Sequence, residues 1–235
     1  MKFSPHINKI SNKRKPGQRS ASSFNRGDDY YKLSEPEISL LKEILSIPTF
    51  YGNEHILTRF IKDYAKGKGY ITQPDRMGNV YITKGNIGKM DYVPLLNAHS
   101  DSVFRDHLEL IKNNQRVDIV IDNDVIKGFH PITKKQMGVG MDDKNGVFIS
   151  LMVLDKIKKG KIIFTTSEEI GMQGARYSVK RKRNEFYSNI SYILALDSPA
   201  INVFTESFFD GPIFDRKSEF FNKSEKIIMK YISHP

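Results

Sequence analysis

The hydrophobic positions between residues 33 and 67 recur at helical spacing and predict two amphipathic helices. The first begins after Ser34, which forms an S-x-x-E capping box with Glu37, and it ends before Pro48. The second runs from about Asn53 and ends at Gly67. Each has one apolar face, so both are expected to cover a sheet. The apolar positions are Ile38, Leu41, Ile44 and Leu45 in the first helix, and Ile56, Leu57, Phe60, Ile61 and Tyr64 in the second.

After these helices, short β-rich runs alternate with helical segments. Predicted strands cover residues 70–72, 80–83, 93–98, 161–166 and 192–196, and predicted helices cover 144–158 and 174–181. Residues 104–136 are polar and predict an excursion from the sheet, with a hairpin around Asn123-Asp124. The alternation predicts an α/β fold in which a mostly parallel sheet is flanked by helices on both faces. Ligands of such sheets bind beyond the carboxyl ends of the strands.

The net charge of +10 is concentrated at the N-terminus. Residues 1–27 hold seven of the 37 basic residues and no acid, which leaves 30 basic and 27 acidic residues in a nearly neutral remainder. A basic, Ser-rich segment buries too little apolar surface to fold, so residues 1–32 are predicted to form a disordered basic tail. Three interpretations stay open: a solvated tail, a tether to nucleic acid or another acidic surface, and an organelle transit peptide.

The sequence contains no cysteine, which limits the kinds of metal site and catalytic site that it can form. It excludes a disulfide framework, a thiolate zinc site and a cysteine nucleophile, so any metal must be held by His, Asp and Glu. No apolar run approaches the roughly 18 to 20 residues that span a bilayer, and the first residues lack the apolar core of a secretory signal. We therefore expect no membrane partner and a cytoplasmic location, which the lack of cysteine also suits.

Four acidic or histidine-containing motifs follow apolar segments. They are N-A-H-S-D at 97–101, G-V-G-M-D-D-K-N-G at 138–146, T-S-E-E-I-G at 166–171 and A-L-D-S-P at 195–199. Residues two apart in an extended chain point to the same side, so His99 is placed to bind a metal while Asp101 orients its imidazole. Each motif also has a structural reading: a buried histidine, two acids capping a helix, or an exposed acidic loop.

In this order the four motifs resemble those of the peptidase T and carboxypeptidase G type metallopeptidases, with the related aminoacylases and glutamyl aminopeptidases. M-G-N-V-Y-I-T-K-G at 77–85 is similar to a further segment of that family, and the likeness spans residues 33–199. The resemblance implies a site in which His99 and Asp197 bind one metal, Asp142 bridges two, and Glu169 binds the second. It makes Glu168 the general base and places Asp101 behind His99. Two zinc ions are expected, and manganese or cobalt is compatible with these ligands.

The activity that the resemblance implies is hydrolysis of amide bonds in small peptides by a metal-activated water, as in tripeptidases and aminopeptidases. A deacylase acting on N-acyl amino acids and a non-catalytic binding or assembly module are the alternatives. Family members continue well beyond the position of Asp197 into a lid or dimerisation domain and a late metal-binding histidine. We therefore expect a truncated form, with the catalytic core at 33–200 and residues 201–235 as the possible start of a lid. Its partners would be a small peptide and a second copy or second chain supplying lid and histidine, unless His234 is the missing ligand.

Overall fold

The computed structural model describes residues 32–122, 125–181, 184–197, 207–208 and 211–212, without the side chains of residues 184, 185, 207, 208, 211 and 212. The chain divides into two compact units, Leu33–Phe204 and a second unit made of Met1–Lys32 with Thr205–Pro235. In the second unit the described strands β9 (Ser207–Phe208) and β10 (Gly211–Pro212) pair antiparallel. The basic tail up to residue 31, the turn at Asn123-Asp124 and the segment with His234 lie outside the described residues.

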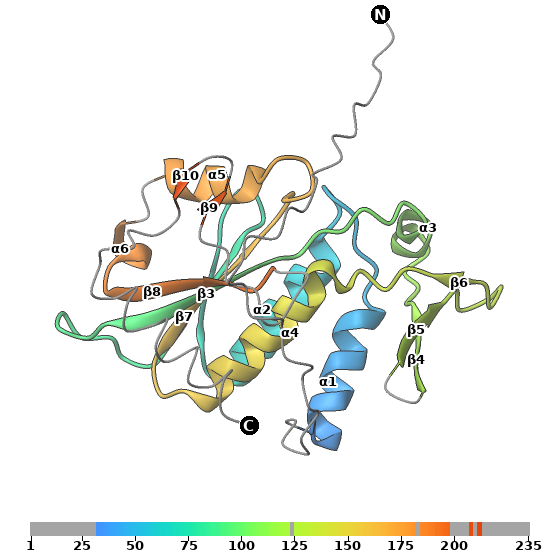
Figure 1. Ribbon diagram of the computed structural model, residues 1–235, viewed down its shortest axis with the longest axis horizontal. Helices are drawn as coiled ribbons and strands as arrows, with labels where there is room; N and C mark the ends of the chain where they lie inside the picture. Colours follow the sequence, from blue (N-terminus) through green and yellow to red (C-terminus); the bar gives the residue numbers. More distant parts are fainter. Residues whose placement is uncertain (1–31, 123–124, 182–183, 198–206, 209–210, 213–235) are drawn as a thin grey trace, which may run out of the picture. The chain divides into compact units, whose positions relative to one another are not determined.

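The first unit is built on a five-stranded sheet with the order β1-β2-β7-β3-β8 (Figure 1). The strands are β1 (Ile71–Pro74), β2 (Val80–Lys84), β3 (Val93–His99), β7 (Gly160–Thr165) and β8 (Ile190–Ala195). β3 lies between β7 and β8 and runs parallel to both, whereas β2 pairs antiparallel with β1 and β7. The sheet is therefore mixed, and the predicted α/β class is confirmed.

The antiparallel pairing of β1 with β2 has a local cause in the turn between them. Asp75 Oδ1 accepts hydrogen bonds from the backbone N–H groups of Met77 and Asn79, at 2.9 and 3.1 Å. Gly78 sits between them with φ of +89°, a conformation that glycine adopts without steric cost. A connection this short can join only antiparallel strands, because parallel strands need a crossover of a dozen or more residues.

Helices cover both faces of the sheet, as the alternation of strands with helices along the chain predicts. The three helices on one face are α1 (Glu35–Ser46), α2 (His55–Gly67) and α4 (Met141–Lys156), whose apolar residues form a single core with Val80 and Ile82 of β2. Tyr81 is the β2 residue between Val80 and Ile82. It packs instead in a smaller core with Phe186 of α6 (Asn184–Tyr187). α5 (Gln173–Lys180) contributes Ser178, which accepts a hydrogen bond from the Tyr81 hydroxyl at 2.7 Å.

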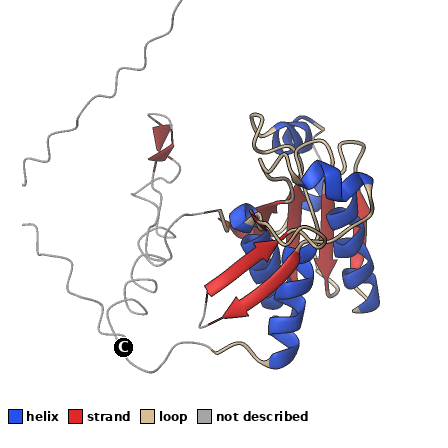
Figure 2. Cartoon of the chain, turned by 90° about the vertical axis from the view of Figure 1, so that its right-hand side faces the viewer, coloured by secondary structure: helices blue, strands red, loops and turns tan. Residues whose placement is uncertain are grey.

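The predicted polar excursion forms a separate three-stranded sheet with the order β4-β5-β6. It contains β4 (Asp118–Asp122), β5 (Val125–Phe129) and β6 (Gln136–Met137), and Figure 2 shows its long hairpin in front of the helices. A short helix that the sequence did not predict, α3 (His107–Lys112), precedes it. Within the described part of the chain, no helix is both long and apolar enough to cross a membrane.

Candidate metal centre

The predicted site residues lie at one edge of the sheet because they follow parallel strands. His99 is the last residue of β3, Glu168 and Glu169 follow β7, and Asp197 follows β8. The carboxyl ends of parallel neighbours meet at the same edge, which brings these three loops together. Asp142 reaches the same place from the opposite direction, at the start of α4.

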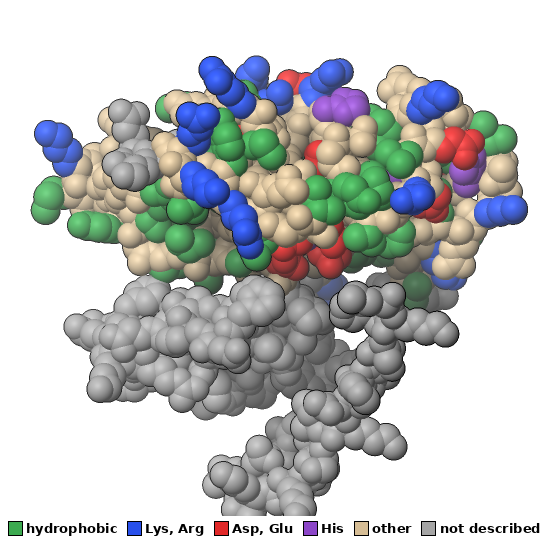
Figure 3. Space-filling view, turned by 90° about the horizontal axis from the view of Figure 1, so that it is seen from above, with side chains coloured by type: hydrophobic (Ala, Val, Ile, Leu, Met, Phe, Trp, Pro, Cys, Tyr) green, Lys and Arg blue, Asp and Glu red, His purple; other side chains and the backbone are tan. Residues whose placement is uncertain are grey.

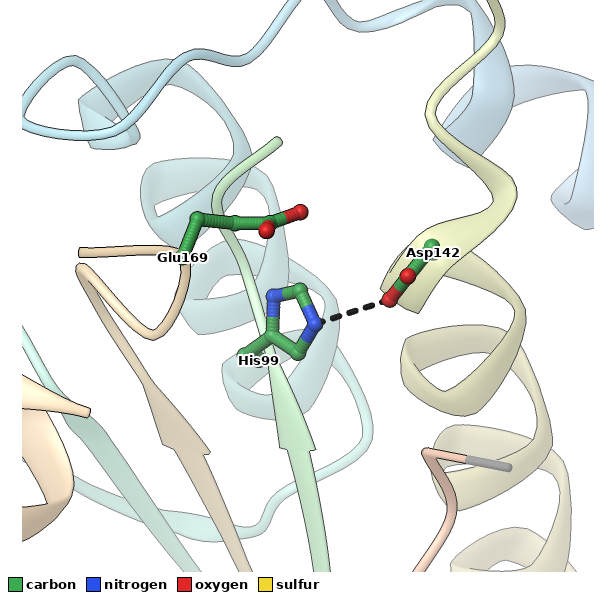
Figure 4. A group of neighbouring side chains, drawn as sticks. All are labelled: His99, Asp142 and Glu169. Carbon is green, nitrogen blue, oxygen red and sulfur yellow. Dashed lines mark hydrogen bonds and ion pairs between the residues drawn. The ribbon is translucent and has the colours of Figure 1, made fainter. Parts of the chain in front are cut away.

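His99 is the centre of this arrangement. Its Nε2 lies 2.9 Å from Asp142 Oδ1 and 4.0 Å from both Glu168 Oε2 and Asp197 Oδ2. In Figure 4 the Asp142 carboxylate points to the imidazole, and the Glu169 side chain extends across the view above the ring. The His99 side chain is 3% exposed, whereas the Asp142 side chain is 72% exposed. The cluster therefore has a buried imidazole at its base and carboxylates that open to solvent.

The ligand atoms form two groups that share His99. His99, Asp142 and Glu169 form one, and His99, Glu168 and Asp197 form the other, with the ligand atoms of each within 4.8 Å of one another. Zinc ligands lie about 2.0–2.2 Å from the ion, so small side-chain rotations would bring either group into contact with an ion. Mixed imidazole and carboxylate donors suit a divalent cation of the zinc or manganese kind. Because Nε2 can bind a single ion, a second ion would have carboxylates alone among the described residues.

Asp101 supports the cluster from beneath. Its carboxylate is fully buried and lies 3.3 Å from His99 Nδ1. The same carboxylate accepts the backbone N–H groups of Glu168 and Glu169, at 2.9 and 3.0 Å. Although burial raises the pKa of Asp101, the bonds from His99 and from these two N–H groups hold it below the usual range. Asp101 thus connects the imidazole to the loop that carries both glutamates.

Asp143 is a second buried carboxylate that the sequence analysis did not single out. Its Oδ2 accepts the backbone N–H of His99 at 3.1 Å, and its Oδ1 accepts the backbone N–H of Gly146 at 2.9 Å. Asp142 and Asp143 have non-helical backbone angles, so regular helical geometry begins at Lys144, as predicted. The two adjacent acids therefore have different roles. Asp142 faces the cluster, and Asp143 connects α4 to the end of β3.

Two further buried side chains hold the loops of the site. Lys144 is fully buried, and its ammonium group donates to the carbonyl oxygens of Val139 and Leu45, at 2.8 and 3.4 Å. Glu54, at the start of α2, accepts the backbone N–H of Ser167 at 3.0 Å. Neither role has a local sequence signal, because Glu54 and Ser167 are 113 positions apart.

The electrostatics of the cluster follow from burial and crowded carboxylates. Burial lowers the pKa of His99, but the carboxylates of Asp101, Asp143 and Asp197 outweigh it and raise that pKa to about 10. Burial and neighbouring acids raise the pKa of Glu168, Glu169 and Asp197. On the face drawn in Figure 3, acidic side chains form several small groups, whereas Lys and Arg side chains are spread over the surface. Such a concentration of carboxylates around one imidazole attracts cations.

Comparison with known proteins shows similarity to peptidases. Residues 113–229 match the family model of the M42 glutamyl aminopeptidases. The cytosol non-specific dipeptidase of Escherichia coli is 26% identical over 147 residues, which cover 60% of this chain and 30% of that protein. The chain is a homologue of these peptidases. It spans about a third of the length of this curated relative.

Solved structures of peptidases also match the fold of this chain. The aminoacylhistidine dipeptidase from Vibrio alginolyticus matches with a TM-score of 0.51 at 25% identity, over 69% of this chain and 33% of that one. A tripeptidase from Staphylococcus aureus matches with a TM-score of 0.53 at 22% identity, over 70% of this chain and 43% of that one. The mixed sheet and its covering helices thus correspond to the catalytic fold of peptidases.

Proposed function

We propose that this chain carries the metal-binding core of a hydrolase that cleaves amide bonds in small peptides. The observation that carries the proposal is the position of His99 Nε2, which faces carboxylates from three other segments of the chain. Homology to peptidases supports a peptide as the substrate. The compact unit Leu33–Phe204 supports a catalytic core at 33–200, with residues 201–235 as a separate segment.

We assign the metal ligands as follows. His99 and Asp197 hold one ion, Glu169 holds the other, and Asp142 lies between them. The group that contains His99 and Asp197 supports the first ion, whereas the other group joins His99 to Asp142 and Glu169 and so contains residues assigned to both ions. When bound, divalent ions act as Lewis acids towards the amide carbonyl and lower the pKa of a water molecule. Zinc suits the mixed donors best, with manganese and cobalt as substitutes.

Glu168 is the proposed general base. Its carboxylate is 31% exposed, lies at the edge of the cluster, and has a pKa raised by burial. A raised pKa suits a group that takes a proton from water and later gives it to the leaving amine. Glu168 also lies close enough to His99 and Asp197 to be a ligand itself. The metal content of a Glu168→Gln variant separates these two roles.

The remaining ligand of the second ion is proposed to come from outside the described residues, either from this protein or from a second chain. Among the described residues, His99 is the one histidine in both groups of candidate ligands. A homodimer or a complex with a second polypeptide would supply it from a second chain, and His234 is the candidate within this chain. The Escherichia coli relative is named as a cytosol dipeptidase, which supports a cytosolic location for this protein as well.

The proposal is tested by counting metals in purified protein and measuring amino acid release from di- and tripeptides. Bound metal together with turnover that a chelator removes supports a metal peptidase. Turnover of N-acetyl amino acids in place of peptides would identify a deacylase, which uses the same site chemistry. Protein that takes up neither zinc nor manganese and hydrolyses none of these substrates contradicts the proposal and leaves a binding module.

A further inference from the structure

A cavity with a volume of about 570 Å³ lies against β1, β2 and the start of β7. Lys161, the second residue of β7, lines it, whereas Glu168 and Glu169 follow the other end of the same strand. Lys161 and the end of the strand at Thr165 are about 13 Å apart, and Glu168 lies three residues beyond that end. The cavity is therefore distinct from the candidate metal centre, and its volume is within the range of small-molecule sites.

The Lys161 side chain is the charged group of this cavity. It is 5% exposed, and its ammonium group donates to the carbonyl oxygens of Phe186 and Ser188, at 2.5 and 2.7 Å. An ammonium group has three hydrogens, so these two bonds leave one hydrogen, and the ammonium group also lies 5.3 Å from the centroid of the Phe186 ring. Carbonyl oxygens are neutral, and they orient the ammonium group without cancelling its charge.

The charge of the cavity is therefore positive. The described residues that line it include Lys161 and no Asp or Glu. Burial lowers the pKa of Lys161, which reflects the cost of a charged group removed from water. A buried ammonium group is stabilised most by an anion that it can bond directly.

The walls of the cavity are mixed, and four large apolar or aromatic side chains contribute to them. The rings of Tyr81 and Phe186 pack edge to face with their centroids 4.9 Å apart, and Ile71 and Ile87 line the cavity beside them. The Tyr81 hydroxyl is directed to Asp75 and Ser178, at 2.8 and 2.7 Å. These bonds occupy its polar end, and the Tyr81 side chain, 1% exposed, forms a rigid part of the wall.

We propose that this cavity binds a small organic anion, in which a carboxylate attached to an apolar or aromatic body bonds Lys161. The described lining offers no acid for an amino group, so an uncharged body is preferred to a zwitterionic amino acid. This site is independent of the proposed peptidase function. Benzoate is the simplest probe that has both parts of the ligand.

The test is a titration of the isotope-labelled full chain with benzoate, followed by NMR spectra of the backbone amides. We expect saturable shifts at Thr83, Asn86 and Ser188, which line the cavity. Benzylamine has a similar body with the opposite charge and should leave these signals in place. Equal responses to benzoate and benzylamine, or no response to benzoate, would overturn the proposal.

Variants then assign the binding to Lys161. Lys161→Met should weaken benzoate binding about tenfold or more, because a charge-assisted hydrogen bond is lost. Lys84→Met is the matched control. Lys84 is on the neighbouring strand, and its ammonium group also donates to two carbonyl oxygens, those of Leu154 and Asp155. Unlike Lys161, it does not line the cavity. Wild-type affinity in Lys161→Met, or equal losses in both variants, would contradict the assignment.

A third variant keeps the test decisive if Lys161→Met does not fold. Asn86 lines the cavity and is exposed, so Asn86→Asp adds a negative charge without disturbing the core. We expect several-fold weaker benzoate binding that recovers at high salt, as for other exposed charges. Unchanged binding in Asn86→Asp at low salt would place benzoate elsewhere.

Discussion

Asp143 Oδ2 accepts the backbone N–H of His99 at 3.1 Å, which joins the start of α4 to the end of β3. The bond fixes the backbone of the central imidazole relative to Asp142, the residue before Asp143. The other oxygen of Asp143 accepts the N–H of Gly146 at 2.9 Å. This buried carboxylate therefore sets the geometry of the cluster without facing it.

Replacing Asp143 by alanine is expected to destabilise the protein and the site together. Each buried N–H that loses its acceptor costs about 1–3 kcal/mol, and two are affected. Urea unfolding should show the loss of stability, and calorimetry should show weaker zinc binding by folded protein. Asp106→Asn, at an exposed acid in the same unit, is the control. Full stability and zinc affinity in Asp143→Ala would show that the two bonds do not set the site.

Glu168→Gln should reduce turnover of small peptides by about 10²- to 10⁴-fold, the usual contribution of a general base. The amide cannot accept the proton from water, whereas the surrounding ligands are unchanged. Metal content measured by mass spectrometry should equal that of the wild type. A variant that loses one metal per chain would instead identify Glu168 as a ligand, and retained turnover would exclude it as the base.

Asp101→Asn should weaken zinc binding about 10- to 100-fold, as is typical when the partner of a metal-binding histidine is lost. The amide oxygen of this variant could still accept one backbone N–H of the glutamate loop, but no negative charge would remain beside His99 Nδ1. Competition with a chromophoric chelator measures the affinity. An unchanged zinc affinity would mean that the 3.3 Å contact between His99 and Asp101 does not support the metal.

The pH dependence of stability should contain a contribution from His107. Its Nε2 donates to the Gly138 carbonyl at 2.8 Å, and its Nδ1 lies 3.0 Å from the Thr49 carbonyl oxygen and 3.2 Å from the Thr49 nitrogen. Burial, followed by the charge of Lys144, lowers the pKa of His107, while Asp106 and the two backbone bonds oppose this. The folded protein thus binds fewer protons at His107 than the unfolded chain does between the two pKa values.

This stabilisation is fully present above the unfolded pKa of about 6.5 and is lost as the pH falls towards the folded pKa. The measurement is urea unfolding of the wild type and of His107→Gln across this range. The difference between their unfolding free energies should shrink by up to about 1.4 kcal/mol per pH unit below pH 6.5. A difference that stays constant down to pH 4 would contradict the prediction.

The sequence was sufficient to predict the elements that depend on neighbouring residues. The capping box placed the start of α1 at Ser34, and Glu37 indeed accepts the Ser34 N–H at 2.8 Å. The alternation of strands and helices indicated the α/β class. The four motifs predicted a site at the edge of the sheet where His99 lies. These features could be found because helical period, strand period and caps are properties of a few consecutive residues.

Other features depended on segments far apart in the chain, and only the tertiary structure decided them. The antiparallel pairing of β2 with β7 joins residues about 80 positions apart, such as Val80 and Phe164. The bond between Asp143 and the His99 backbone, and the orientation of the buried Lys161, likewise have no local pattern. A buried charge is stable only where folding brings acceptors to it, so the sequence supplied these residues and tertiary packing gave them their roles.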